Sequence, residues 1–217
     1  MIDFNFPVLH AEFEQHSNLK KDILDAINIE DENNLEKTET YHCIKCNDRV
    51  TAEVGFNCKD KECLCECYTY NISRVDWNNS KDTERPWVKI FGSPFLNHLD
   101  RELLKLSLQT PQMVNLWFQQ YINNSSHGWH IHGHNFTGVY YLELNECSPK
   151  TQLIEPISLK MLEIDAKEGD IVLFPSMFIH RSPLMKSNKR KTIISFNFDC
   201  VGIDKKTQIK LKNLYGY

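Results

Sequence analysis

Hydrophobic residues at helical spacing mark two segments in the first half of the chain. In the first segment Leu19, Ile23 and Ile27 recur every four residues, which places them on one face of a helix. Ser17 is a typical N-cap residue and would begin this helix. The second segment starts at residues 93–94, a serine cap followed by a first-turn proline. Its buried stripe would consist of Leu96, Leu99, Leu103 and Leu106.

From Val114 onward the pattern changes to short apolar runs that are separated by turns. Residues 135–144 are rich in aromatic and β-branched side chains, and residues 169–180 form another apolar run that ends in His180. Turn-forming residues stand at 123–126, 148–149 and 168–169. Many short strands with regular turns are typical of an all-β sandwich or barrel. The sequence therefore predicts a mainly β domain with helices before it.

The second half of the chain contains a dense group of histidines. Four of the nine histidines lie within residues 127–134, which read His-Gly-Trp-His-Ile-His-Gly-His. Alternate side chains of a strand share a face, so His130 and His132 would lie side by side with Ile131 turned away. His180 can supply a third imidazole from a distant strand. Neutral imidazole binds zinc, copper, iron or nickel, so the pattern predicts a metal site without naming the metal.

Four motifs in order carry a resemblance to a known superfamily. They are Trp-His130-Ile-His132, then Thr-Gly-Val-Tyr-Tyr-Leu, then Gly-Asp-Ile-Val-Leu-Phe-Pro-Ser followed by His180, then Arg-Lys-Thr-Ile-Ile-Ser-Phe-Asn-Phe. From about residue 112 to 200 the chain resembles the 2-oxoglutarate- and iron(II)-dependent oxygenases, with the prolyl-hydroxylase-like proteins of phages and marine microbes as the nearest likeness. The resemblance implies a double-stranded β-helix in which a His-x-Asp/Glu pair and a distal histidine hold iron. It also implies a basic residue after the distal histidine that binds the far carboxylate of 2-oxoglutarate.

The histidine pair departs from that pattern, because His132 stands where an acid is usual. No Asp or Glu lies between residues 115 and 142, so a neighbouring carboxylate cannot take its place. His130, His132 and the distal histidine would form a three-imidazole site, as in many cupins, which share the barrel. His132 with His134 is the rival pair. We favour His130 with His132 because Gly133 is expected to end the strand.

Two basic residues compete as the anchor for the cosubstrate. Arg190 followed by Thr192 matches the Arg-x-Ser/Thr pattern of the superfamily, and both would lie on one face of a strand. Lys191 fits better if the register is counted back from the middle of that strand. Arginine offers a planar fork that matches a carboxylate, whereas lysine acts as a point charge, so we assign the anchor to Arg190. By the same resemblance Tyr141 would donate its hydroxyl to the cosubstrate, with Tyr121 as a second candidate.

Six of the eight cysteines lie in 25 residues of the first half. Cys43 and Cys46 form a Cys-x-x-Cys pair, a hairpin-like segment follows at 49–55, and four more cysteines come after it. This arrangement resembles a zinc ribbon, and cysteines of an intracellular protein are more often metal ligands than disulfides. Zinc takes four ligands, so Cys43 and Cys46 with two later cysteines, here Cys58 and Cys63, are the economical set. The alternative is a group of buried, reduced thiols.

The charge of the chain and the length of its apolar runs restrict the classes of function that remain. A formal net charge of -4 argues against general nucleic-acid binding. Charge is uneven, however: residues 1–40 carry ten acids and three bases, whereas residues 181–217 carry nine bases and two acids. No apolar run approaches the length of a membrane span, and the first residues lack the basic start of a signal peptide. We expect a soluble, cytoplasmic protein with no membrane partner.

These patterns predict one domain over residues 1–217. Its barrel core would span 112–200, and residues 1–110 would supply helical support and a Cys-rich insertion at 41–70. The implied function is an oxygenase that uses Fe(II), O2 and 2-oxoglutarate to hydroxylate a C–H bond of an unidentified substrate, releasing succinate. One alternative is a cupin-like three-histidine metal enzyme that does not use 2-oxoglutarate. Another is a zinc-braced binding protein with a degenerate barrel.

Overall fold

The computed structural model describes residues 8–30, 35, 41–42, 49–50, 70–106 and 108–203, with residues 206, 209, 210 and 213 near the C-terminus. Two helices, α1 (His16–Asn28) and α2 (Pro86–Leu104), and a 3-10 turn, η4 (Trp77–Asn79), accompany the strands of this described part. The strands are β1 (Leu9–Glu12), β2 (Tyr41–His42), β3 (Arg49–Val50), β4 (Tyr70–Asn71), β5 (Arg74–Val75), β6 (Leu108–Tyr121), β7 (Ser126–His130), β8 (Phe136–Glu143), β9 (Gln152–Ile154), β10 (Met161–Glu163), β11 (Asp170–Pro175), β12 (Ile179–Ser182) and β13 (Lys191–Ile203).

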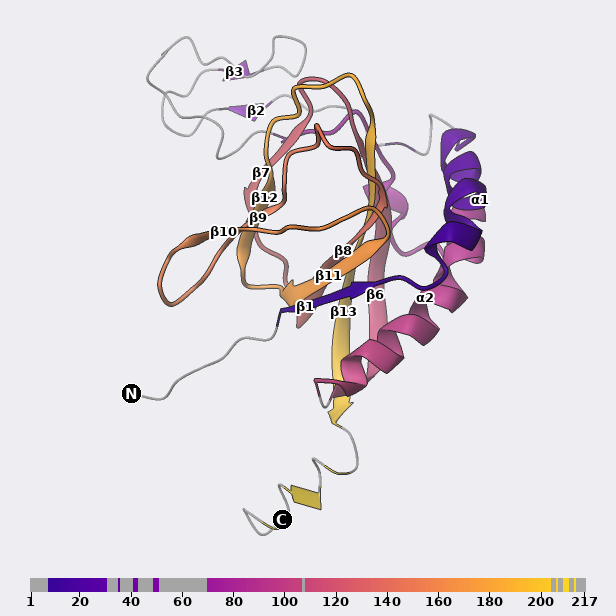
Figure 1. Ribbon diagram of the computed structural model, residues 1–217, viewed down its shortest axis with the longest axis vertical. Coiled ribbons are helices and arrows are strands. Elements are labelled where there is room, and N and C mark those ends of the chain that lie inside the picture. The colour runs from indigo at the N-terminus through magenta and orange to yellow at the C-terminus, as the bar shows by residue number, and fades with distance from the viewer. Residues whose placement is uncertain are drawn as a thin grey trace.

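Two antiparallel sheets face each other. The larger has the order β1-β11-β8-β13-β6-β5, and the smaller has the order β10-β9-β12-β7-β4. Helices α1 and α2 cover the side of the larger sheet that faces away from the smaller one (Figure 1). The predicted mainly β architecture with supporting helices is therefore confirmed. Neither helix in the described part of the chain is long and apolar enough to span a membrane.

The first predicted helix is confirmed, whereas the predicted start of the second was wrong. In α1 Ile23 and Ile27 are buried, although Ser17 lies inside the helix instead of capping it. Helix α2 begins at Pro86, which occupies its first turn, and Pro94 lies in its interior. An interior proline costs a helical hydrogen bond, and packing offsets that cost here. Its buried face consists of Trp87, Val88, Phe91, Phe95, His98, Leu99, Glu102 and Leu103.

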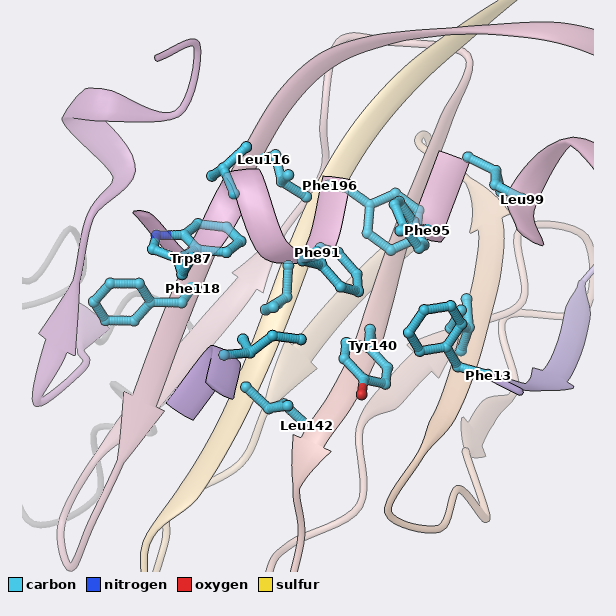
Figure 2. Close-up of a cluster of buried hydrophobic side chains, with 14 of the residues drawn as sticks. Phe13, Trp87, Phe91, Phe95, Leu99, Leu116, Phe118, Tyr140, Leu142 and Phe196 are labelled. Carbon is cyan, nitrogen blue, oxygen red and sulfur yellow. The ribbon is translucent and has the colours of Figure 1, made fainter. Parts of the chain in front are cut away.

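Aromatic rings fill the layer between the helices and the larger sheet (Figure 2). The ring of Phe91 lies between Phe95, at a centroid distance of 4.6 Å, and Tyr140, at 5.2 Å. On β8, Tyr140 points into this layer, while Val139 and Tyr141 belong to the second cluster, between the two sheets. The helices thus support β8 from behind, and alternate residues of the same strand face the space where the sheets meet.

The apolar run 169–180, read as one strand from the sequence, is two strands. β11 belongs to the larger sheet and β12 to the smaller, and residues 176–178 connect them. Pro175 has no N–H with which to continue the ladder, and the N–H of Phe178 closes a turn on its carbonyl. The crossing carries His180 from one sheet to the other, where it pairs with His130 of β7.

Gly138 of β8 allows close packing and provides a test of the core. A Cβ at this position would lie 2.4 Å from Cζ of Phe196 and 2.6 Å from Cδ2 of Leu173. Overpacking a tight core costs roughly 1–3 kcal/mol, so Gly138→Ala is expected to lower the free energy of unfolding by that amount. Gly133→Ala is the control, since nothing lies within 4 Å of its Cβ position. Equal urea midpoints for the two variants would contradict this account of the core.

The cysteine motif cannot be compared with the structure. Strands β2 and β3, which come before and after Cys43 and Cys46 in the sequence, form a small antiparallel pair, and this pair does not test the predicted hairpin at 49–55. Cys43, Cys46, Cys58 and Cys63 all lie outside the described residues. The structural zinc site therefore stays a prediction.

Candidate metal centre

A bulge in β7 and the crossing from β11 to β12 bring four histidines together. His180 pairs directly with His130, and Ser182 pairs with His127. A step of three residues along β7 therefore matches a step of two residues along β12. An extra residue in one strand reverses the usual alternation of side chains beyond it. His127 and His130 therefore face the same cavity. His132 follows the end of β7, and its backbone N–H donates to the carbonyl of Ser176 at 3.0 Å.

Three of these histidines form a compact donor set. One ring nitrogen from each of His130, His132 and His180 lies within 4.8 Å of the others. Nε2 of His132 lies 3.3 Å from Nε2 of His180. Nδ1 of His130 lies 2.7 Å from the carbonyl of Gly128, and Nδ1 of His180 lies 2.9 Å from that of Phe178. Each of these two Nδ1 atoms donates to its carbonyl, which leaves Nε2 as a lone-pair donor for a metal.

Burial keeps these imidazoles neutral. Loss of solvent, together with the neighbouring His130 and His134, lowers the pKa of His132 to about 3. Burial also lowers the pKa of His130, although the hydrogen bond to Gly128 opposes this effect. The pKa of His180 is held well below its usual value by the same desolvation. Neutral imidazoles can coordinate a cation without first losing a proton. No Asp or Glu lines this cavity in the described part of the chain.

The cavity lies between the two sheets, and all four of these histidines line it. It encloses about 30 Å³, and its walls include Trp117, Gln119, Tyr121, Thr151, Ser182, Ile193 and Ser195. Lys191 lies behind the cavity wall, against Tyr121 and Ser182, and its side chain is fully buried. Its Nζ donates to the carbonyl of Pro149 and to Oγ of Ser182, each at 3.3 Å.

Lys191 is a buried cation without an acidic partner among the described residues. Its Nζ lies 5.4 Å from the ring centroid of Tyr121 and 5.9 Å from that of Tyr141. Burial lowers the pKa of Lys191 to about 8. A buried ammonium without a carboxylate is costly, so this position is suited to an anionic ligand.

Arg190 and Thr192 lie on the other face of β13. The Nε atom of Arg190 donates to Oε2 of Glu143 at 2.7 Å, and a terminal nitrogen donates to Asn28 of α1 at 2.8 Å. Thr192 donates to the same carboxylate oxygen at 2.8 Å. The sequence was right that these two residues share a face, but that face lies on the helix side of the sheet. The geometry therefore favours Lys191, and not Arg190, at the cavity.

The two tyrosines named from the sequence both lie near Lys191. The hydroxyl of Tyr141 donates to Oγ1 of Thr151 at 2.7 Å, and that of Tyr121 donates to Oε1 of Gln119 at 3.1 Å. Burial raises the pKa of both tyrosines above the usual value, so both keep their protons as hydrogen-bond donors.

His134 does not join the group. Its Nδ1 lies 3.5 Å from a carboxylate oxygen of Asp199, outside the cavity. Sequence reasoning assigned no role to His127, Gln119 or Thr151, all of which line the cavity. His127 stood in the histidine motif, but alternation counted from His130 puts it on the opposite face. Nothing local marks Gln119 or Thr151.

No protein-family model and no curated protein matches the chain. Solved structures do match. A prolyl hydroxylase from Trichoplax adhaerens, in complex with a hypoxia-inducible-factor peptide fragment, is 14% identical with a TM-score of 0.57, covering 94% of this chain and 86% of that one. The chain has the double-stranded β-helix fold of the 2-oxoglutarate oxygenases. AviO1 from Streptomyces viridochromogenes is 10% identical with a TM-score of 0.58, covering 92% of each chain.

A third similar structure is a prolyl-4-hydroxylase from Pseudomonas putida. It is 10% identical with a TM-score of 0.52, covering 88% of this chain and 92% of that one. At these identities the similarity establishes the fold, and one fold supports many reactions. The chemistry of this chain must be argued from its own cavity.

Proposed function

We propose that this chain is an oxygenase that uses Fe(II) and 2-oxoglutarate to hydroxylate a C–H bond of another molecule. One observation carries the proposal: three neutral imidazoles line a cavity, and a buried lysine without an acidic partner in the described chain lies behind its wall, against Ser182 and Tyr121. A metal with open coordination positions suits the imidazoles, and a carboxylate suits the lysine. A dicarboxylate such as 2-oxoglutarate can use both.

The residues divide into two functional groups in this proposal. His130, His132 and His180 hold the iron and leave positions open for other ligands. Lys191 binds the far carboxylate, with the hydroxyls of Tyr121 and Tyr141 as neutral donors nearby. The enclosed space of about 30 Å³ is smaller than 2-oxoglutarate, so side chains along the cavity must turn aside when it enters.

Iron(II), when bound, supplies the activation of O2. In the overall reaction one oxygen atom enters succinate, carbon dioxide leaves 2-oxoglutarate, and the other oxygen atom becomes the hydroxyl of the product. The residues of the chain orient the cosubstrate by its far carboxylate and keep water from the reacting atoms.

The absence of an acid from the described cavity wall favours a second candidate, a cupin-like metal enzyme that does not use 2-oxoglutarate. Three imidazoles leave the charge of a divalent metal unreduced, whereas a carboxylate ligand would lower it by one. Lys191 distinguishes the two candidate functions. An enzyme that binds no dicarboxylate would have no anionic ligand to pair with this buried cation.

An anaerobic titration tests the proposal. Fe(II) is added to metal-free protein, followed by 2-oxoglutarate, and the visible absorption is recorded. We expect a charge-transfer band that requires both additions, and consumption of 2-oxoglutarate to succinate once O2 is admitted. Iron binding with neither a band nor succinate would reject the proposal in favour of the cupin-like enzyme.

The pKa of Lys191 predicts how cosubstrate binding depends on pH. The protonated amine attracts the carboxylate and the neutral amine does not, so affinity is complete below the pKa of about 8 and falls as pH rises through it. The dissociation constant for 2-oxoglutarate should therefore rise up to roughly tenfold per pH unit above that value. Calorimetry on the Mn(II)-loaded protein from pH 7 to pH 9.5 measures this change.

Lys191→Arg is the matched control for the pH experiment. Arginine stays protonated over this range, so its profile should be flat. The same rise in both proteins would mean that another group, and not Lys191, titrates.

A further inference from the structure

His127 has no part in the proposed metal or cosubstrate site, yet it is one of the most closely placed side chains of the cavity. Its ring lies 3.8 Å from the ring of His130, centroid to centroid, and the two planes differ by only 15°. His127 and His130 are three positions apart, so in a regular strand their side chains would face opposite sides. The bulge in β7 brings them to the same side and permits this contact. Bulges beside functional sites commonly redirect a side chain, and here the redirected side chain covers a proposed metal ligand.

The orientation of His127 is set by a chain of hydrogen bonds from the other end of the cavity. Oε1 of Gln119 accepts from the hydroxyl of Tyr121 at 3.1 Å and from Oγ of Ser195 at 3.2 Å. These two donors fix which end of the Gln119 amide points away from His127. The NH2 group therefore faces Nδ1 of His127, at a long 3.4 Å, and Nδ1 is the acceptor.

His130 needs such a support. It is the last residue of β7, and its Nδ1 has the carbonyl of Gly128 as its hydrogen-bond partner. One hydrogen bond defines a direction, but the ring plane can still tilt about it. A flat ring stacked on one side removes that freedom. Groups behind metal-bound histidines typically contribute 10–100-fold to metal affinity.

We propose that His127, oriented by Gln119, is a positioning residue that holds the ring plane of His130 for metal binding. This inference rests on the proposed metal site, because His130 must be a ligand for its plane to matter. Gln119 also contacts Tyr121, so the support extends from the metal end of the cavity to the end proposed for the carboxylate.

Two variants separate the flat ring from simple filling of space. His127→Leu keeps an apolar side chain but removes the ring, and His127→Phe keeps a flat ring. Metal-free protein is titrated with Co(II), and affinity and the visible d–d spectrum are recorded. We expect His127→Leu to bind Co(II) about 10–100-fold more weakly with an altered spectrum. His127→Phe should stay within about threefold of wild type with the original spectrum, because the stack remains.

His98→Leu is the matched control, since His98 is also buried but lies in α2 against Phe13, away from the cavity. Its Co(II) affinity should equal that of wild type. Wild-type affinity in His127→Leu, or a loss of tenfold or more in His127→Phe, would overturn the inference while leaving the metal site in place. If His127→Leu fails to fold, the result for His127→Phe alone decides. A wild-type protein that binds no Co(II) would instead reject the metal site, and the inference with it.

Discussion

His180→Ala is expected to abolish metal binding and activity while leaving the fold intact. His180 is buried, and its Nε2 faces His132 across 3.3 Å. The residues on either side of it in β12, Ile179 and Arg181, carry no imidazole or carboxylate and cannot replace the lost nitrogen. Two imidazoles from one short segment hold a divalent metal much less firmly than three. Metal content after dialysis and Fe(II) titration measure the loss, and circular dichroism checks the fold.

Variants of the adjacent histidines test which pair of histidines binds the metal. His130→Ala should lose the metal as His180→Ala does, whereas His134→Ala should keep it, because His134 contacts Asp199 outside the cavity. Metal retained in His130→Ala but lost in His134→Ala would move the pair to His132 and His134.

The second large effect is expected at the anchor for 2-oxoglutarate. Lys191→Ala removes the cation behind Ser182 and Tyr121 of the cavity wall and leaves a buried carboxylate unpaired, which costs about 2–5 kcal/mol. The apparent Michaelis constant for 2-oxoglutarate should rise by tens-fold or more, with little change in iron affinity. Steady-state kinetics at varied 2-oxoglutarate, with iron in excess, measure this effect.

Arg190→Ala is the control for that prediction, because Arg190 is already engaged by Glu143 and Asn28 on the helix side of the sheet. Its Michaelis constant should change far less. The reverse order of effects would return the anchor to Arg190. No effect in either variant, together with no turnover of 2-oxoglutarate, would reject the oxygenase proposal.

Local patterns in the sequence determined much of this protein. Short apolar runs and turn residues predicted the strands after residue 114, and the fourfold apolar spacing predicted α1. The order of the histidine and basic motifs carried the resemblance that implied the double-stranded β-helix. The start of α2 was missed, since Trp87, Phe91 and Phe95 bury its first half against the sheet and outweigh the helix-breaking tendency of Pro94.

The tertiary structure decided which faces of the strands form the cavity. Residues 191–198 of β13 are all buried, because helices cover one side of the larger sheet and the smaller sheet covers the other. Polarity therefore does not alternate along β13, and the sequence alone could not tell the face of Lys191 from that of Arg190 and Thr192. His127 was hidden for a related reason: one extra residue in β7 reverses the alternation, and that bulge exists only through pairing with β12, some fifty residues away.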